Sequence, residues 1–312
     1  MKPLRQGINE YLEYRWRLGF KLQDAKYRLL GFASFMEQNQ AKHVTTELAL
    51  AFATMNTEAT PATWATRLGT IRRFAIYWSA IDPKTEIPHK NLLPITYPRR
   101  TPYIYSDAEI IKLLNPECGG FSCNQFDQHV YCVLFGLLTV TGMRVAEALN
   151  LECTDVDLQH GIITVRQSKF RKSRHIPIHK STVEVLRKFS IYREQHLSHP
   201  VISRFLVNHK GNALNIWTVD WVFRKRLIQI GIAKPKEHCN PRVVDLRHRF
   251  AVMTLLQWYK QNVVSIDTHI PLLSTYLGHV CPTGTYWYLT ATPELLKFIV
   301  SRCEKYKKES KS

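Results

Sequence analysis

The sequence lacks the features that mark secreted, membrane-spanning and zinc-stabilised proteins. Its seven cysteines are scattered and form no Cys-x-x-Cys pair, which argues against a zinc ribbon or a disulfide framework. The first residues lack the apolar core of a signal peptide. The longest apolar run, around Val130 to Val140, is too short to cross a bilayer. We therefore predict a cytoplasmic protein that uses no metal and no other cofactor and does not enter a membrane.

Acidic residues are also scarce. Asp and Glu number 25 against 43 Lys and Arg, so the formal net charge is +18. Hydrophobic residues make up 45% of the chain, which is enough for folded cores. A folded chain with this charge favours a polyanionic partner, most often nucleic acid. A basic protein without such a partner is the alternative at this point.

Hydrophobic periodicity divides the chain into two mostly helical parts. Residues 1–92 hold four amphipathic segments, the last of which begins at a cap on Thr60. A stretch rich in proline and without periodicity follows, and we assign it to a linker over residues 93–105. The second part, residues 106–312, opens with the helix-start pattern Ser-Asp-Ala-Glu at Ser106.

A small sheet is expected to interrupt the helices of the second part. Residues 162–165 and 175–178 have the composition of two short strands, and a basic hairpin, 168–174, joins them. Thr292 and Pro293 begin a further helix, which precedes a Lys-rich tail. The predicted fold class is therefore mainly α with a small antiparallel β-sheet.

A set of separated residues has the chemistry needed to break a phosphodiester. A guanidinium can bind a phosphate through two hydrogen bonds, a lysine can protonate the leaving oxygen, and a tyrosine hydroxyl can attack phosphorus. The residues are Arg144 in Thr-Gly-x-Arg, Lys169 in the basic hairpin, Arg247 in Asp-Leu-Arg-His, His279 in Leu-Gly-His, and Tyr288 nine residues further on.

In order and spacing, these motifs resemble the tyrosine recombinase (phage integrase) family over nearly the whole chain. The resemblance implies a helical, SAM-like core-binding domain that contacts DNA over residues 1–92, and a catalytic domain with a C-terminal helix and tail over 106–312. It implies a site-specific DNA recombinase that works through a 3′-phosphotyrosyl intermediate without metal or ATP. In that family Tyr288 would be the nucleophile, and Lys169 would protonate the departing 5′ oxygen.

The resemblance also implies how the protein meets DNA and its partners. It suggests a tetramer on double-stranded DNA, joined through the C-terminal helix, with a second recombinase as a further partner. The setting would be the nucleoid of a bacterial cell and a mobile genetic element. Plain DNA contacts are predicted for the remaining basic residues of the hairpin and the linker, namely Arg166, Arg171, Lys172, Arg174, Arg99 and Arg100.

One motif departs from the family, and it leaves alternatives open. The family carries a histidine three residues before Arg247, where this chain has Val244. Either the site works with one donor fewer, or His238 or His248 supplies it. A DNA-binding accessory protein without catalysis and a type IB topoisomerase are therefore alternatives. Tyr286 is a rival to Tyr288, and each arginine could instead serve its helix, Arg144 by pairing with Glu147 and Arg247 behind an N-cap on Asp245.

Overall fold

The chain forms two compact units, residues 1–100 and 101–312. The computed structural model describes residues 3–94, 101–116, 124–166, 173–197, 203–233, 241–261, 266–279 and 281–290, together with 296 and 300. The exact limits of the linker, 93–105, stay a prediction.

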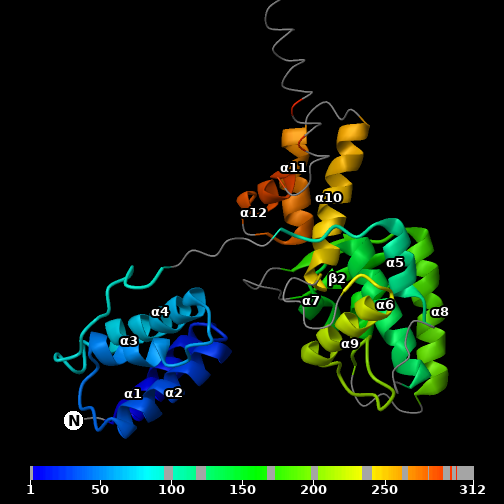
Figure 1. Ribbon diagram of the computed structural model, residues 1–312. Coiled ribbons are helices and arrows are strands. Elements are labelled where there is room, and N and C mark those ends of the chain that lie inside the picture. Colours follow the sequence, from blue (N-terminus) through cyan, green and yellow to red (C-terminus); the bar gives the residue numbers. More distant parts are fainter. Residues whose placement is uncertain are drawn as a thin grey trace, which may run out of the picture. The chain divides into compact units, whose positions relative to one another are not determined.

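The first unit is a bundle of helices around one hydrophobic core (Figure 1). Its helices are α1 (Leu4–Arg17), α2 (Gln23–Gln38), α3 (Thr46–Thr54) and α4 (Pro61–Trp78). The predicted cap on Thr60 is confirmed, because its side chain accepts a hydrogen bond from the backbone N–H of Thr63. Trp78 closes the core where α1 crosses α4: it is 2% exposed and stacks on Phe74.

The second unit combines helices with a small sheet and holds two hydrophobic clusters. Helix α6 lies at its centre and packs against α5, α8 and α10. Figure 1 shows α10, α11 and α12 close together on one side of this unit. Its helices are α5 (Asp107–Leu114), α6 (Gln125–Thr141), α7 (Val145–Leu149), α8 (Lys180–His196), α9 (Ile216–Gln229), α10 (Val244–Lys260), α11 (Ile266–Leu277) and α12 (Thr283–Tyr286), with 3-10 turns η1 (Cys153–Asp155) and η3 (Trp287–Thr290).

The sheet has three antiparallel strands in the order β1-β2-β3: β1 (Val156–Asp157), β2 (Ile162–Val165) and β3 (Arg174–Pro177). In the β2–β3 register, Val165 lies opposite Arg174 and Ile162 opposite Pro177. The mainly α fold class with a small antiparallel sheet is confirmed, and β1 is a strand that the sequence analysis missed. At Ser106 the predicted helix start is a complete capping box with Glu109.

Within the residues that the structure describes, no helix is long and apolar enough to cross a membrane.

The contact between α1 and α4 gives a direct test of the first core. A Cβ added at Gly7 would lie 1.9 Å from Cζ3 of Trp78. We expect Gly7→Ala to lower the free energy of unfolding by about 1–3 kcal/mol, because a buried and stacked indole must move. Gly31→Ala is the matched control, since its Cβ would meet Phe52 at an ordinary 3.5 Å. Urea unfolding should show a loss for the first variant alone, and equal effects would contradict the packing.

Candidate active site

Arg144 is the N-cap of helix α7, and both its backbone and its guanidinium are held by hydrogen bonds. Its backbone N–H donates to Oε2 of Glu147 at 2.9 Å, and its Nη1 donates to Oε1 of the same carboxylate at 2.7 Å. Its Nη2 donates to the carbonyl oxygen of Gly278 at 2.9 Å. The predicted pairing with Glu147 is therefore present. Together with the bond to Gly278 it fixes the position of the Arg144 guanidinium, so this arginine is not merely a surface charge paired along its own helix.

Arg174 grips the same carboxylate from strand β3. Its Nη1 and Nη2 donate to the two oxygens of Glu147 at 3.1 and 2.8 Å, and its Nε donates to the carbonyl oxygen of Tyr276 at 2.7 Å. The side chain is 10% exposed. We predicted a plain DNA contact for Arg174, but these contacts turn its guanidinium inward, because a buried carboxylate binds it more strongly than solvent does.

Glu147 carries a full negative charge although it is buried. Burial alone would raise its pKa, but hydrogen bonds from Arg174 and from the backbone and side chain of Arg144 outweigh burial and lower the pKa to about 2. Its charge therefore persists at neutral pH. Two guanidiniums share one carboxylate here, so the cluster keeps a net positive charge that favours an anion.

Arg247 is the most deeply enclosed arginine of the site, at 5% exposure. Its Nη1 donates to the carbonyl oxygen of Gly142 at 2.8 Å, and its Nη2 donates to that of Leu277 at 2.7 Å. Burial lowers the pKa of Arg247 to about 10, Tyr288 raises it and Arg144 lowers it. At neutral pH the group stays a cation, and it joins the end of α6 to the end of α11.

His279 lies directly after the left-handed Gly278 that ends α11, as the motif predicted (φ +69°). An N–H of Arg247 Nη2 faces its Nε2 at 3.1 Å, so Nε2 must be the unprotonated acceptor. The proton of the neutral ring is then on Nδ1, which donates to Oγ1 of Thr285 at 2.8 Å. Burial, followed by Arg247, Arg144 and Arg174, lowers the pKa of His279 to about 4. Thr285 is a member of the site that the sequence analysis missed.

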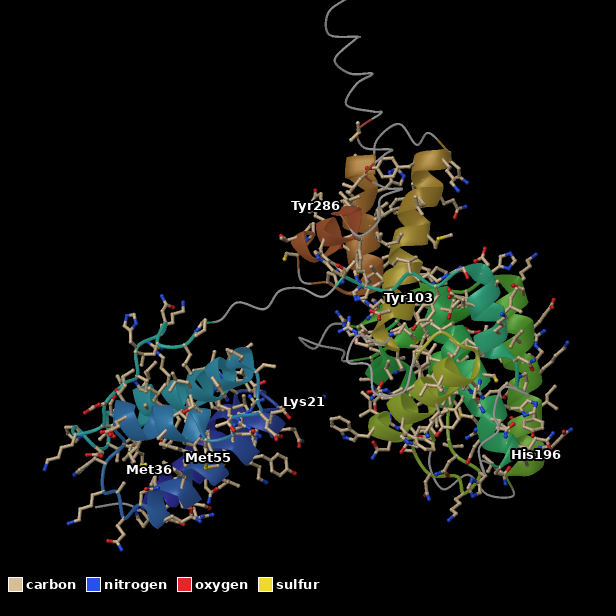
Figure 2. The ribbon with its side chains drawn as sticks, in the orientation of Figure 1. Lys21, Met36, Met55, Tyr103, His196 and Tyr286 are labelled. Carbon is tan, nitrogen blue, oxygen red and sulfur yellow. The ribbon has the colours of Figure 1, made fainter. Side chains whose placement is uncertain are left out.

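Tyr288 packs directly on His279, whose ring centroid lies 6.0 Å from that of the tyrosine at an interplanar angle of 22°. It is 3% exposed and also interacts with the guanidinium of Arg247. Tyr286, the rival, is 45% exposed and lies at the edge of the unit (Figure 2). Of the two tyrosines, Tyr288 is the one that the structure brings to the arginines and the histidine.

The first turn of α10 differs from the prediction in two ways. Asp245 is not the N-cap, because the helix begins one residue earlier, at Val244. The Asp245 carboxylate instead accepts from the backbone and side chain of Arg242 at 2.8 and 3.1 Å. Val244 is 41% exposed and offers no hydrogen bond where the family has a histidine.

His248 lies one turn after Val244 on α10, and its ring packs beside that of Tyr288. Its ring lies 5.4 Å from that of Tyr288 and 5.1 Å from that of Trp287. Its Nδ1 is buried and has no hydrogen-bond partner among the described residues. Burial lowers the pKa of His248 to about 4, with Asp245 acting in the opposite direction. A neutral ring in this place supports the tyrosine by packing.

Several predicted site residues lie outside the described residues. They are Lys169, Arg171 and Lys172 of the hairpin, Arg99 and Arg100 of the linker, and His238. Arg166 is described: its side chain is 63% exposed and pairs with Asp155 at the surface. In the part of the chain that the structure describes, no group of three or more His, Cys, Asp or Glu side chains could hold a metal ion.

The assembled residues bring the guanidiniums of Arg144 and Arg247, the imidazole of His279 and the ring of Tyr288 together. Glu147 and three backbone carbonyl groups hold the guanidiniums of Arg144 and Arg247 in position. Hydrogen-bond donors that are positioned before the reaction can stabilise the negative charge that develops on a phosphoryl group. The neutral imidazole of His279 packs beside Tyr288, and its one unprotonated nitrogen, Nε2, accepts from Arg247. This arrangement suits attack of the tyrosine on a phosphodiester.

Comparison with known proteins identifies the class. The model of the phage integrase family matches residues 110–294, and the protein y4rB of Sinorhizobium fredii (strain NBRC 101917 / NGR234), named as an integrase/recombinase, is 43% identical over 310 residues, 98% of each chain. The chain belongs to the phage integrase family. It is a site-specific recombinase, an enzyme that cleaves and rejoins DNA strands, and these matches do not favour the topoisomerase or the non-catalytic accessory protein.

Solved structures share the fold. The site-specific recombinase XerH, in a post-cleavage complex with a palindromic difH substrate, is 20% identical with a TM-score of 0.64, over 89% of this chain and 78% of that one. A lambda integrase tetramer bound to a Holliday junction is 17% identical with a TM-score of 0.62, over 91% of this chain and 76% of that one.

The tautomer of His279 can be measured without DNA. We expect selective ¹⁵N labelling to show a neutral, Nδ1-protonated ring that persists as the pH falls from 7 toward 5, because its pKa lies near 4. Thr285→Val removes the acceptor of the Nδ1 proton, so the ring should no longer be held in the Nδ1-protonated form and DNA cleavage should slow about 10–100-fold. Thr285→Ser keeps a hydroxyl and should preserve both the Nδ1-protonated ring and the cleavage rate. A wild-type ring that titrates near its ordinary value, or carries its proton on Nε2, would contradict the geometry.

Proposed function

We propose that Tyr288 is the nucleophile of strand cleavage and that Arg144 and Arg247 bind the scissile phosphate. The phenol oxygen forms a bond to phosphorus while the bond from phosphorus to the 5′ oxygen breaks, which leaves a 3′-phosphotyrosyl linkage. Lys169 protonates the departing 5′ oxygen, and neutral His279 takes the proton of the phenol on Nε2 once the N–H of Arg247 has left Nε2 for the bound phosphate. The released 5′ hydroxyl of a partner strand then reverses the step and restores the phosphodiester.

One observation carries this proposal. Arg247 simultaneously contacts the carbonyl oxygens of Gly142 and Leu277 and the imidazole of His279, which itself packs on Tyr288. Motifs from three distant segments therefore meet around one guanidinium. A fixed donor of this kind typically contributes about 10²–10³-fold to the rate when charge develops on the bound oxygens.

The proposed substrate is double-stranded DNA, bound by both units. Support comes from the net charge of +18 and from XerH and lambda integrase, whose structures contain DNA. Residues 1–92 would act as a core-binding domain, 93–105 as a linker and 106–312 as the catalytic domain. Arg166, Arg171, Lys172, Arg99 and Arg100 would contact the backbone, because each phosphate neutralised by a basic side chain releases counterions.

The proposed assembly is a tetramer on DNA, in which the C-terminal helix after Pro293 docks on a neighbouring protomer. The tetramer of lambda integrase on a Holliday junction supports it. Strand exchange needs two duplexes to be cleaved and joined in register, which a closed ring of protomers provides. A second recombinase would supply some of the four protomers of this ring. The tetramer would act in the nucleoid of a bacterial cell.

Trapping on a nicked duplex tests the nucleophile. When the strand piece beyond the scissile phosphate can diffuse away, cleavage cannot reverse and the covalent adduct accumulates. We expect the wild-type protein to form this adduct in the presence of EDTA on DNA that borders its own coding region. Tyr288→Phe should form none while its Kd for the same DNA is unchanged.

The control is Tyr286→Phe, which removes an exposed phenol two residues away and should cleave like the wild type. If the adduct still forms with Tyr288→Phe and is lost with Tyr286→Phe, Tyr286 is the nucleophile. Tight binding without any adduct would support the accessory protein instead.

A further inference from the structure

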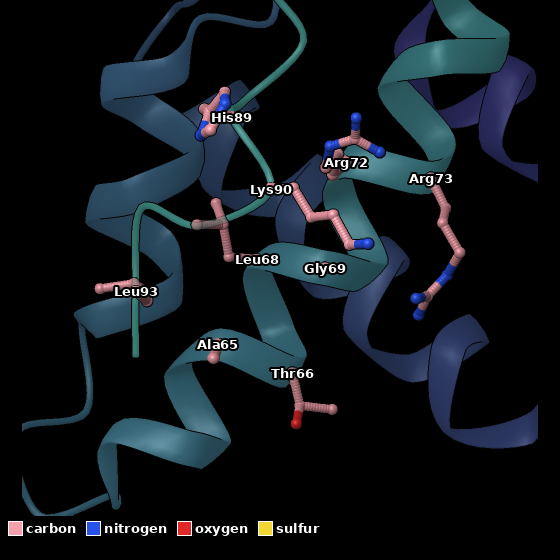
Figure 3. A pocket seen from close by; sticks show the side chains of 9 residues that line it. All are labelled: Ala65, Thr66, Leu68, Gly69, Arg72, Arg73, His89, Lys90 and Leu93. Carbon is pink, nitrogen blue, oxygen red and sulfur yellow. The ribbon is translucent and has the colours of Figure 1, made fainter. Parts of the chain in front are cut away.

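The first unit carries a hollow of about 310 Å³ that the active site does not involve (Figure 3). It lies between helix α4 and the segment that follows it, around His89 to Leu93. Arg72 and Arg73 come from α4, and Lys90 reaches across from the following segment (Figure 3). All of these residues belong to one unit, so the hollow exists independently of how the two units are arranged.

The charged side chains that line the hollow are all cations. Arg72, Arg73 and Lys90 are cations, and no carboxylate is among the residues that line it. Nε of Arg72 is buried and has no partner within the described part of the chain. A backbone N–H, that of Asn91, faces Nδ1 of His89 at 3.4 Å, which leaves Nε2 as the donor of this ring. A buried donor without an acceptor, such as Nε of Arg72, is costly, and an anion in the hollow would provide an acceptor.

The floor of the hollow is open to a ligand because small residues follow one face of α4. Ala65 and Gly69 are one helical turn apart, and Arg72 and Arg73 continue the same face. A Cβ added at Gly69 would meet only Nη1 of Arg73, at 3.8 Å. Glycine is therefore not required here by packing within the unit, but its lack of a side chain lets a ligand approach the helix.

We propose that this hollow binds a phosphate group, and that the phosphate belongs to the backbone of the DNA substrate. Two guanidiniums and an ammonium that line a small cavity suit the two non-bridging oxygens of a backbone phosphate, because a planar fork can donate to both oxygens and each oxygen can accept more than one hydrogen bond. The apolar wall made by Leu68 and Leu93 suits the adjoining sugar. The proposal rests on the proposed DNA-binding function and assigns it a definite anchor in the first unit.

The salt dependence of DNA binding tests the anchor. We expect Arg73→Gln and Lys90→Gln, both exposed and made in the full chain, to raise the Kd for duplex DNA. Each should also reduce the slope of log K against log salt by about 0.9, the contribution of one phosphate contact. Arg17→Gln is the matched control: it removes the same charge from a side chain that is 78% exposed and paired with Glu13, and its slope should equal that of the wild type.

Two further measurements separate this proposal from its competitors. Saturating amounts of either variant should still form the covalent adduct on nicked DNA. If the wild type forms no adduct, the proposed function fails; if it does but all salt slopes coincide, the anchor fails. Inorganic phosphate is the probe for a free ligand. Binding of phosphate that Lys90→Gln abolishes, with an unchanged salt slope for DNA, would assign the hollow to a free phosphate and overturn the DNA anchor.

Discussion

The carboxylate of Glu147 is the contact on which the rest of the active site depends. It accepts hydrogen bonds from Arg144 and Arg174, which come from the start of α7 and from strand β3. Breaking such a buried ion cluster by removing one partner typically costs about 3–5 kcal/mol, because the remaining charges lose their compensation. The same contact fixes the direction of Arg144. The Glu147 carboxylate thus links stability to the geometry of the site. Through Arg174 it holds strand β3 to α7, and it also orients the guanidinium of Arg144.

The two glycine motifs form a reciprocal pair around this cluster. Gly142 and Gly278 each end a helix in the left-handed region, with φ of +60° and +69°. The carbonyl of Gly278 accepts from Arg144, and that of Gly142 accepts from Arg247, so each motif supports the arginine of the other. A side chain at either glycine would be strained by the positive φ, and its Cβ would lie 2.5 Å from Cδ1 of Phe250 at Gly142 and 2.9 Å from Nη1 of Arg174 at Gly278, so these side chains would have to shift.

Local signals in the sequence predicted the caps at Thr60 and Ser106, the hairpin strands and the glycine that ends α11, because each depends on a few neighbouring residues. The N-cap predicted at Asp245 was wrong. Arg174 could not be assigned from the charge of its hairpin, since its role depends on Glu147, far away in the chain. Strand alternation was the usable signal: Arg174 shares a face with buried Ile176. Nothing local marked Thr285, whose hydroxyl matters only through His279, or β1, which is two residues long.

The most direct test of the account is a crystal structure with DNA and orthovanadate, which replaces the transferring phosphoryl group by a five-coordinate vanadium. The account predicts vanadium bonded to the phenol oxygen of Tyr288, with N–H groups of Arg144 and Arg247 about 3 Å from its equatorial oxygens. Vanadium bonded to Tyr286, or guanidiniums that face away from the metal oxyanion, would contradict it.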